Sequence, residues 1–272
     1  MIDLHSHTTE SDGTFSPQEL VAEAQRVAVS TLAITDHDTL AGYDEALPYA
    51  RAAGVELICG IELSTKWQGQ SVHLLGYFPQ PRMLNGFREW ILQLQASRRE
   101  RNLHLIARLQ ELGIDITLKE VEARGRGMTG RPHFARVLMD KGYASSIQDA
   151  FDKFLSESGK AYVDRLEPQF AEAVQRIRDA GGVASMAHPV RFKGDFPAAL
   201  PDLCQAGLHA IEAYHSDHSP EQIQEFLLLA RQSNLSITGG SDFHGTVKPG
   251  IQLGTGRNGN VQVPDSVLQK LR

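Results

Sequence analysis

The feature that most constrains this chain is a pair of histidines directly after its first apolar segment. Residues 1–4 are predicted to form a short buried strand. His5 and His7 follow it two positions apart, so their side chains leave the same face of an extended chain. Asp12 comes five positions after His7. Imidazoles and a carboxylate at a strand end are typical of a metal site. Taken alone, the segment is also compatible with two ordinary surface histidines.

The pattern of an apolar strand followed by polar residues recurs along the chain. Six later segments have the composition of strands: residues 31–34, 55–60, 71–77, 183–187, 210–214 and 235–238. Helical patterns separate most of them, and two helices are predicted to start at Ser-Pro pairs, at Ser16 and Ser219. In α/β barrels the site lies at the C-terminal ends of the strands. We therefore predict a seven-stranded α/β barrel with its chemistry at the C-terminal end of each strand.

The alternation of strands and helices stops after Pro79 and Pro81. A long helix is predicted for residues 87–112, and further helices after Pro132 and over residues 147–155. The predicted division is residues 1–80 and 167–272 for the barrel and residues 81–166 for an inserted helical cap domain.

Charge is distributed unevenly along the chain, whose net charge is −6. Residues 82–168 hold 15 Lys and Arg against 12 Asp and Glu, which leaves 12 against 21 for the rest. Spare positive charge in the middle segment suits an anionic substrate. A protein that coats duplex DNA should be more basic than this, so we expect no stable binding to duplex DNA.

The sequence favours a cytoplasmic protein without membrane contact. It holds no apolar run long enough to span a bilayer, and no signal peptide fits before the first predicted strand. Cys59 and Cys204 are far apart and have no C-x-x-C partner. They are expected to be buried free thiols in a reducing compartment.

The polar residues at the predicted strand ends form a recognisable series. It comprises residues 3–13, Thr35-Asp36-His37-Asp38, Gly60-Ile61-Glu62, His73, Ala187-His188-Pro189 and Gly240-Ser241-Asp242-Phe243-His244. This series resembles the PHP (polymerase and histidinol phosphatase) family and covers both predicted barrel segments. The resemblance implies a distorted (β/α)7 barrel that holds two to three divalent metal ions.

The resemblance also assigns the ligands residue by residue. One ion would take His5, His7, Glu62 and Asp242; a second would take Glu62, His73 and His188; a third would take Asp12, His37 and His244. Each set mixes imidazole with carboxylate, which suits Mn, with Fe or Zn as alternatives, rather than Ca.

The predicted insertion narrows the resemblance to one branch of the PHP family. Its position, with residues 129–134 and 158–163, resembles the PHP branch that contains nucleoside 3′,5′-bisphosphate phosphatases and 5′–3′ exoribonucleases. Arg131 and His133 flank Pro132 at a predicted helix N-terminus, where free N–H groups and the helix dipole attract phosphate. We predict that Arg131, His133 and Lys160 bind substrate. The alternative is a solvated helix start without a ligand.

Two further features of the sequence bear on the site. Residues 125–130 match G-x-G-x-x-G, but no apolar strand precedes them, so a dinucleotide site is not expected. His215 ends a predicted strand, so it either contacts substrate or has a structural role.

The predicted function is a metal-dependent phosphoesterase that acts on a nucleotide or short RNA. It would remove the 3′-phosphate of nucleoside 3′,5′-bisphosphates, cleave short 5′-phosphorylated RNA from its 5′ end, or both. Hydroxide bridging two metals would attack phosphorus without a covalent enzyme intermediate. Glu62, Asp242 and His215 are the predicted catalytic residues. The sequence identifies no protein partner.

Two alternatives remain open. One is a histidinol-phosphate phosphatase, against which the basic insertion argues, because a small monoester needs no such cap. The other is a non-catalytic PHP module that uses its metals for structure or partner binding. The complete set of ligand residues argues against this second alternative.

Overall fold

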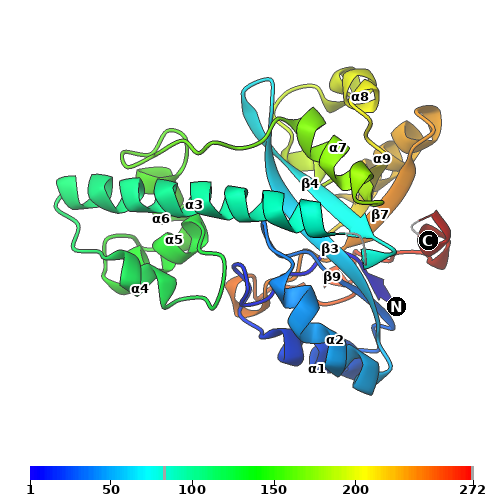
Figure 1. The fold of residues 1–272 in the computed structure, drawn as a ribbon, viewed down its shortest axis with the longest axis horizontal. Coiled ribbons are helices and arrows are strands. Elements are labelled where there is room, and N and C mark those ends of the chain that lie inside the picture. Colours follow the sequence, from blue (N-terminus) through cyan, green and yellow to red (C-terminus); the bar gives the residue numbers. More distant parts are fainter. Residues whose placement is uncertain (82–83, 271–272) are drawn as a thin grey trace.

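The chain folds around one curved sheet of seven strands. The computed structural model describes residues 1–81 and 84–270. The strands lie side by side in the order of the sequence and curl into a barrel (Figure 1). Their bounds are β1 Ile2–Asp3, β2 Thr31–Ile34, β3 Glu56–Trp67, β4 Gln70–Phe78, β5 Val183–Met186, β6 Ala210–His215 and β7 Ser236–Gly240. The predicted seven-stranded α/β barrel is confirmed.

One strand runs against the others. β4 pairs antiparallel with both β3 and β5, whereas all other pairs in the sheet are parallel. β3 and β4 form a long hairpin closed by Gln68 and Gly69, which have φ angles of 46° and 83°. Such a two-residue turn reverses the chain. His73 therefore lies in the first half of its strand, and the prediction that every site residue follows the C-terminal end of a strand is wrong for β4.

The two ends of the sheet meet beyond β1 and β7. The amide of His7 donates to the carbonyl of Phe243 (2.9 Å), and the amide of Asp242 donates to the carbonyl of His5 (2.8 Å). These bonds extend the pairing past both strands, and Ser6 bridges Phe243 in parallel. Closure of the barrel thus places residues 5–7 directly against residues 242–243 of the last predicted motif.

Helices cover the outside of the barrel. They are α1 Pro17–Arg26, α2 Ala41–Ala53, α7 Phe170–Asp179, α8 Phe196–Gln205 and α9 Pro220–Gln232. Ser16 and Ser219 cap α1 and α9 as predicted, each in a capping box that satisfies free N–H groups of the first turn. A small hairpin of β8 Ile251–Gln252 and β9 Gly256–Arg257 follows β7. Within the described residues, no helix is long and apolar enough to cross a membrane.

The insertion is built on one long helix. α3 Asn85–Glu111 carries α4 Leu118–Glu122, α5 Arg131–Asp140, α6 Ile147–Ala150 and a π-helix Phe151–Leu155 against its far half (Figure 1). That half has its own apolar core, which includes Leu105, Leu109 and Phe134. The near half packs Phe87 and Trp90 into the barrel core. One continuous helix therefore belongs to both cores and holds the insertion beside the barrel.

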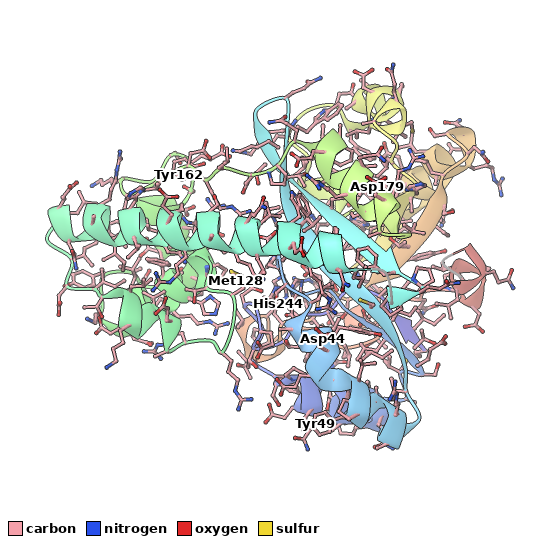
Figure 2. The ribbon with its side chains drawn as sticks, viewed as in Figure 1. Asp44, Tyr49, Met128, Tyr162, Asp179 and His244 are labelled. Atoms are coloured by element: carbon pink, nitrogen blue, oxygen red, sulfur yellow. The ribbon has the colours of Figure 1, made fainter. Side chains whose placement is uncertain are left out.

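A glycine-rich loop of the insertion is bonded to the loop after β1. The amides of Arg126 and Met128 donate to the carbonyls of Thr9 (2.9 Å) and Glu10 (2.6 Å). A Cβ at Gly127 would lie 2.4 Å from the Glu10 carbonyl, so only glycine permits this approach. The G-x-G-x-x-G match thus has a packing explanation. Met128 of this loop and His244, both labelled in Figure 2, line the same cavity.

Candidate metal centre

Glu62 lies at the middle of a histidine cluster. Its Oε1 is 2.7 Å from His73 Nδ1 and 2.9 Å from His188 Nε2. Its Oε2 faces three more ring nitrogens at 3.2–3.3 Å, those of His5, His7 and His37. The antiparallel hairpin explains the first contact, because His73 lies opposite Ser64, two positions from Glu62 on the same face. One carboxylate thus faces two separate groups of imidazoles.

Asp242 completes the first group. Its Oδ1 is 3.4 Å from Nε2 of both His5 and His7. Its Oδ2 points elsewhere, toward Lys248 Nζ at 2.7 Å and an Arg191 nitrogen at 3.2 Å. The two oxygens of Asp242 therefore have different surroundings: Oδ1 faces imidazoles, and Oδ2 faces two cationic side chains and the His215 ring.

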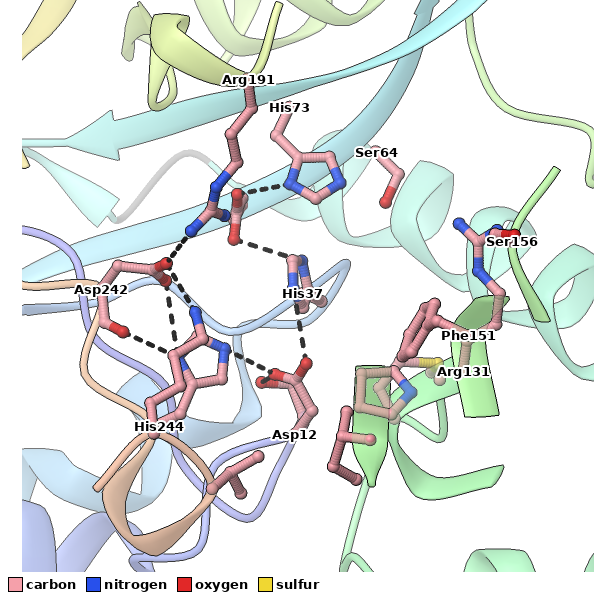
Figure 3. Close-up of a pocket in the computed structure, with 18 of the residues that line it drawn as sticks. Asp12, His37, Ser64, His73, Arg131, Phe151, Ser156, Arg191, Asp242 and His244 are labelled. Atoms are coloured by element: carbon pink, nitrogen blue, oxygen red, sulfur yellow. Dashed lines mark hydrogen bonds and ion pairs between the residues drawn. The ribbon is translucent and has the colours of Figure 1, made fainter. Parts of the chain in front are cut away.

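A further group gathers around Asp12 at the barrel mouth (Figure 3). Asp12 Oδ1 is 3.3 Å from His244 Nε2, and Asp12 Oδ2 is 3.7 Å from His37 Nε2. His7 joins this group, with its Nδ1 3.6 Å from Asp12 Oδ1. The structure brings all nine predicted ligand residues together, and His7 links two of the three predicted sets.

Hydrogen bonds set the orientation of two of these histidines. His5 Nδ1 lies 2.8 Å from Glu212 Oε1, and His244 Nδ1 lies 2.8 Å from the Asp242 carbonyl. Each Nδ1 faces an oxygen, so Nε2 is the ring nitrogen that is turned toward the cluster. Sequence reasoning missed Glu212. The available signal was a single carboxylate inside an apolar strand, which is costly to bury without a partner.

Three residues of the centre have left-handed backbone conformations. The φ angles of Asp38, His188 and Asp242 are 54°, 27° and 56°. Such angles are uncommon outside glycine, and strained residues cluster at functional sites. At His188 the backbone amide donates to Glu212 Oε2 at 2.6 Å. Glu212 therefore holds both the His5 ring and the strained turn at His188.

The buried carboxylates and histidines of the centre shift one another's pKa values. Burial raises the pKa of Glu62, but His37, His73 and His5 outweigh burial and hold this pKa well below its ordinary value. Burial lowers the pKa of His5, but the carboxylates of Glu212, Glu62 and Asp242 hold it well above the ordinary value. Burial lowers the pKa of His37 to about 3, so its ring is neutral at neutral pH and one of its nitrogens keeps a lone pair for a metal ion.

A divalent cation fits this donor set. His7 Nε2 and His37 Nδ1 are buried and have no hydrogen-bond partner within the described part of the chain. Buried polar atoms of this kind need a partner, and an ion among them would supply one. Mixed imidazole nitrogens and carboxylate oxygens suit transition metals or zinc. The residues present thus fit a divalent metal ion.

A cavity of about 620 Å³ opens beside the centre. Asp12, His37, Glu62, His73, Asp242 and His244 line one side of it, and the insertion lines the other. Figure 3 shows Arg131, Phe151 and Ser156 across the cavity from Asp12 and His37. A volume of this size is typical of small-ligand pockets.

The predicted substrate-binding residues occupy different places. Arg131 lines the cavity, donates to the Leu155 carbonyl (3.3 Å) and lies over the Tyr162 ring. His133 is fully buried, and its Nδ1 accepts from the Gly130 amide at 3.1 Å. Lys160 is exposed and lies outside the cavity lining.

His215 lies behind the centre rather than in the cavity. It is fully buried, and its Nε2 is 3.4 Å from Asp242 Oδ2. Its Nδ1 accepts from the Asp217 amide at 3.0 Å. A catalytic role for His215 stays a prediction, as do substrate-binding roles for His133 and Lys160.

Three cationic residues that sequence reasoning missed line the cavity. Arg191 and Lys248 flank Asp242, and Arg98 reaches the cavity from α3. Arg191 follows His188 by three positions and Lys248 follows His244 by four, so each lies next to a recognised motif. Their nearness to a motif was the only signal in the sequence. The direction of both side chains depends on loops whose sequence has no regular pattern.

Comparison with known proteins agrees with this geometry. The PHP domain family profile matches residues 3–182. A 5′-3′ exoribonuclease from Haemophilus influenzae is 35% identical over 273 residues, which cover 98% of this chain and 96% of that protein. A 3′,5′-nucleoside bisphosphate phosphatase from Chromobacterium violaceum is 32% identical, covering 93% of this chain and 90% of that protein.

A solved structure extends the likeness to three dimensions. A protein from Bifidobacterium adolescentis described as a metal-dependent phosphoesterase superimposes with a TM-score of 0.87 at 31% identity. The superposition covers 99% of this chain and 94% of that protein. Barrel and insertion are therefore both shared with it.

Proposed function

The chain belongs to the PHP domain family and is a metal-dependent phosphoesterase, and we propose that its substrates are nucleotides that carry two phosphates. The reaction would release the 3′-phosphate of a nucleoside 3′,5′-bisphosphate or remove nucleotides from the 5′ end of short 5′-phosphorylated RNA. The two relatives with these activities support the proposal over nearly the full chain.

The observation that carries the proposal is the shape of the cavity. It joins the ligand residues of the barrel to Arg131 of the insertion in one space of about 620 Å³. A reacting phosphate would lie against the barrel side while a second phosphate reaches Arg131. We propose that residues 81–166 act as a cap that encloses the substrate over the barrel mouth.

The centre is proposed to hold two to three ions, with Mn preferred and Fe or Zn as alternatives. The ligands would be His5, His7, Glu62 and Asp242 for one ion, Glu62, His73 and His188 for another, and Asp12, His37 and His244 for a third. When bound, the ions would polarise the phosphoryl oxygens and lower the pKa of a coordinated water to the neutral range.

The protein's own groups would bind and orient the substrate. Arg191 and Lys248 carry positive charge at the cavity wall beside Asp242, where they would attract the reacting phosphate. Arg131 would hold the second phosphate and so fix the distance between the two ends of the nucleotide. Glu212 would keep the His5 ring in its orientation throughout.

A substrate panel tests the proposal. Metal-loaded protein would be assayed with a nucleoside 3′,5′-bisphosphate, a 5′-phosphorylated oligoribonucleotide, histidinol phosphate and an aryl monophosphate. We expect the highest kcat/KM for the first two. Highest activity on histidinol phosphate would support the small-molecule alternative, and bound metal without hydrolysis of any ester would support a non-catalytic module.

A further inference from the structure

The ring of His7 lies between two groups of possible metal ligands. One group contains His5 and Asp242, and the other contains Asp12, His37 and His244. His7 Nε2 is 3.4 Å from Asp242 Oδ1 in the first group, whereas Nδ1 is 3.6 Å from Asp12 Oδ1 in the second. A neutral imidazole has one N–H and one lone pair, so it can serve a metal ion through one nitrogen only. The position of one hydrogen therefore decides which group gains His7 as a ligand.

A buried serine lies against Nδ1 of His7. Ser11 Oγ is 3.3 Å from Nδ1 and 2.6 Å from Asp36 Oδ1. The other acceptor within its reach, Asp12 Oδ1, is farther away at 3.4 Å. Ser11 and Asp36 are each only 1% exposed, so both bonds are shielded from water. A hydroxyl has a single hydrogen, and the short bond to Asp36 uses it, which leaves a hydroxyl lone pair toward His7.

The carboxylate of Asp36 is held firmly by the segments around it. Thr8 donates to it twice, from its amide to Oδ1 and from its hydroxyl to Oδ2, both at 2.7 Å. A Cβ at Gly42 would overlap Asp36 Oδ2, so only glycine lets the start of α2 close over this carboxylate. The backbone carbonyl of Asp36 accepts from the Glu62 amide at 3.3 Å. Asp36 thus connects the loop after β1 to the strand that carries the central carboxylate.

We propose that Ser11 and Asp36 are positioning residues that keep a hydrogen on His7 Nδ1 and commit His7 Nε2 to a single ion. His7 then joins His5, Glu62 and Asp242 as a ligand of an inner ion. Asp12, His37 and His244 alone are left to an outer ion, and all three line the cavity. Three protein ligands with an open position are the usual arrangement at a catalytic metal. This inference rests on the ligand sets of the proposed function.

The consequence is a loss of metal affinity when the hydroxyl is removed. Groups that orient a metal-binding histidine through its other ring nitrogen typically contribute about tenfold to a hundredfold to metal affinity. Neither Ser11 nor Asp36 belongs to a proposed ligand set. Their effect on metal binding should therefore pass entirely through His7.

The test is calorimetric titration with Mn²⁺ of protein stripped of metal by a chelator. Ser11→Ala should bind Mn²⁺ about tenfold to a hundredfold more weakly than wild type. Ser11→Thr keeps the hydroxyl and should retain most of the affinity. Ser185→Ala is the matched control, because it removes a buried hydroxyl that lies 2.8 Å from Thr238 Oγ1 instead. Unchanged affinity in Ser11→Ala would overturn the proposal.

Two variants of Asp36 test the other half of the pair. Asp36→Ala removes the acceptor and should weaken Mn²⁺ binding as Ser11→Ala does, whereas Asp36→Asn keeps an acceptor oxygen and should lose less. Circular dichroism of each metal-free variant checks that the barrel is folded. Equal losses in Asp36→Ala and Asp36→Asn would show that the negative charge matters rather than the acceptor, against the proposal.

A double-mutant cycle separates positioning from a general structural effect. In a His7→Asn background, Ser11→Ala should cause little further loss of Mn²⁺ affinity, because the ring that Ser11 orients is gone. Similar losses in both backgrounds would show that Ser11 does not act through His7.

Nitrogen NMR of the histidine rings shows the hydrogen directly. In the Zn²⁺-loaded wild type, the His7 signals, assigned by their absence in His7→Asn, should show the hydrogen on Nδ1 and the metal on Nε2. A metal-bound Nδ1 would refute the proposal. If Ser11→Ala weakens Mn²⁺ binding through His7 while wild type hydrolyses no nucleotide, the positioning role stands and the proposed substrate class fails.

Discussion

Oδ2 of Asp38 lies 2.8 Å from Nη1 of Arg165, although 127 positions separate the two residues in the sequence. Arg98 of α3 donates to the same oxygen. Asp38 directly follows the predicted ligand residue His37, is fully buried, and accepts the Ser64 amide at 3.2 Å. A single carboxylate at the mouth of the barrel thus fastens both ends of the insertion beside the metal centre.

Replacing Asp38 by asparagine should destabilise the protein strongly. The change leaves two buried guanidinium groups without their carboxylate, and breaking a buried pair costs about 3–5 kcal/mol in the free energy of unfolding. Urea unfolding of metal-free protein measures it. Asp44→Asn is the matched control, because Asp44 pairs with Arg88 in an exposed pair and should cost only about 0–1 kcal/mol. Equal losses in both variants would contradict a fastening role.

The ion pairs of Asp38 with Arg165 and Arg98 also predict how the free energy of unfolding depends on pH. Burial raises the pKa of Asp38, but Arg165 and Arg98 outweigh burial and hold it well below the ordinary value. The stabilisation is therefore complete above the unfolded-state pKa of about 3.9 and is lost as the pH falls below it. The gap in unfolding free energy between wild type and Asp38→Asn should shrink between about pH 5 and pH 3. A gap that grows on acidification would show the opposite sign of linkage.

Glu62→Gln should remove more metal and more activity than the loss of a ligand to one ion, such as His73→Asn. Glu62 faces two groups of imidazoles, so it would serve two ions at once, and the amide cannot replace its charge. Metal content by elemental analysis and turnover are the readouts, with circular dichroism to check folding. Turnover near wild type with a full metal complement would exclude a bridging role.

His37→Asn should lower the metal content by about one ion per chain, as expected when one site loses an essential ligand. His37 lies between Asp12 and Glu62 at 3.7 and 3.3 Å. His104→Asn, at an exposed histidine of α3 outside the centre, should leave the metal content unchanged. An unaltered stoichiometry in His37→Asn would remove the third ion from the proposal.

Arg131→Ala should impair a substrate with two phosphates far more than an aryl monophosphate, whose single phosphate goes to the metal centre. A charge-assisted contact is worth about tenfold to a hundredfold in kcat/KM. Comparing two substrates on one preparation cancels any loss of folded protein. Arg99→Ala, at an exposed position of α3, serves as the control. Equal losses on both substrates would mean that Arg131 acts only through its contacts to Leu155 and Tyr162.

Much of the architecture was predictable because it is encoded locally. Alternating apolar segments identified the seven strands, and the Ser-Pro pairs at Ser16 and Ser219 marked two helix starts. The two-residue spacing of His5 and His7 placed both rings on one face. Resemblance in the later motifs then supplied the other ligand residues, which barrel closure brings within reach of one another.

Other features were decided only by the tertiary structure. Glu212 and His5 are 207 positions apart, and nothing near either residue indicates that one orients the other. The direction of β4 followed from a turn at Gln68 and Gly69 that carries no strong signal in the sequence. Arg101 lies on a helix with several arginines, and only the packing of the insertion buries it. Local pattern determines which segments become strands and helices, but the partners of a buried charge depend on which distant segments pack around it.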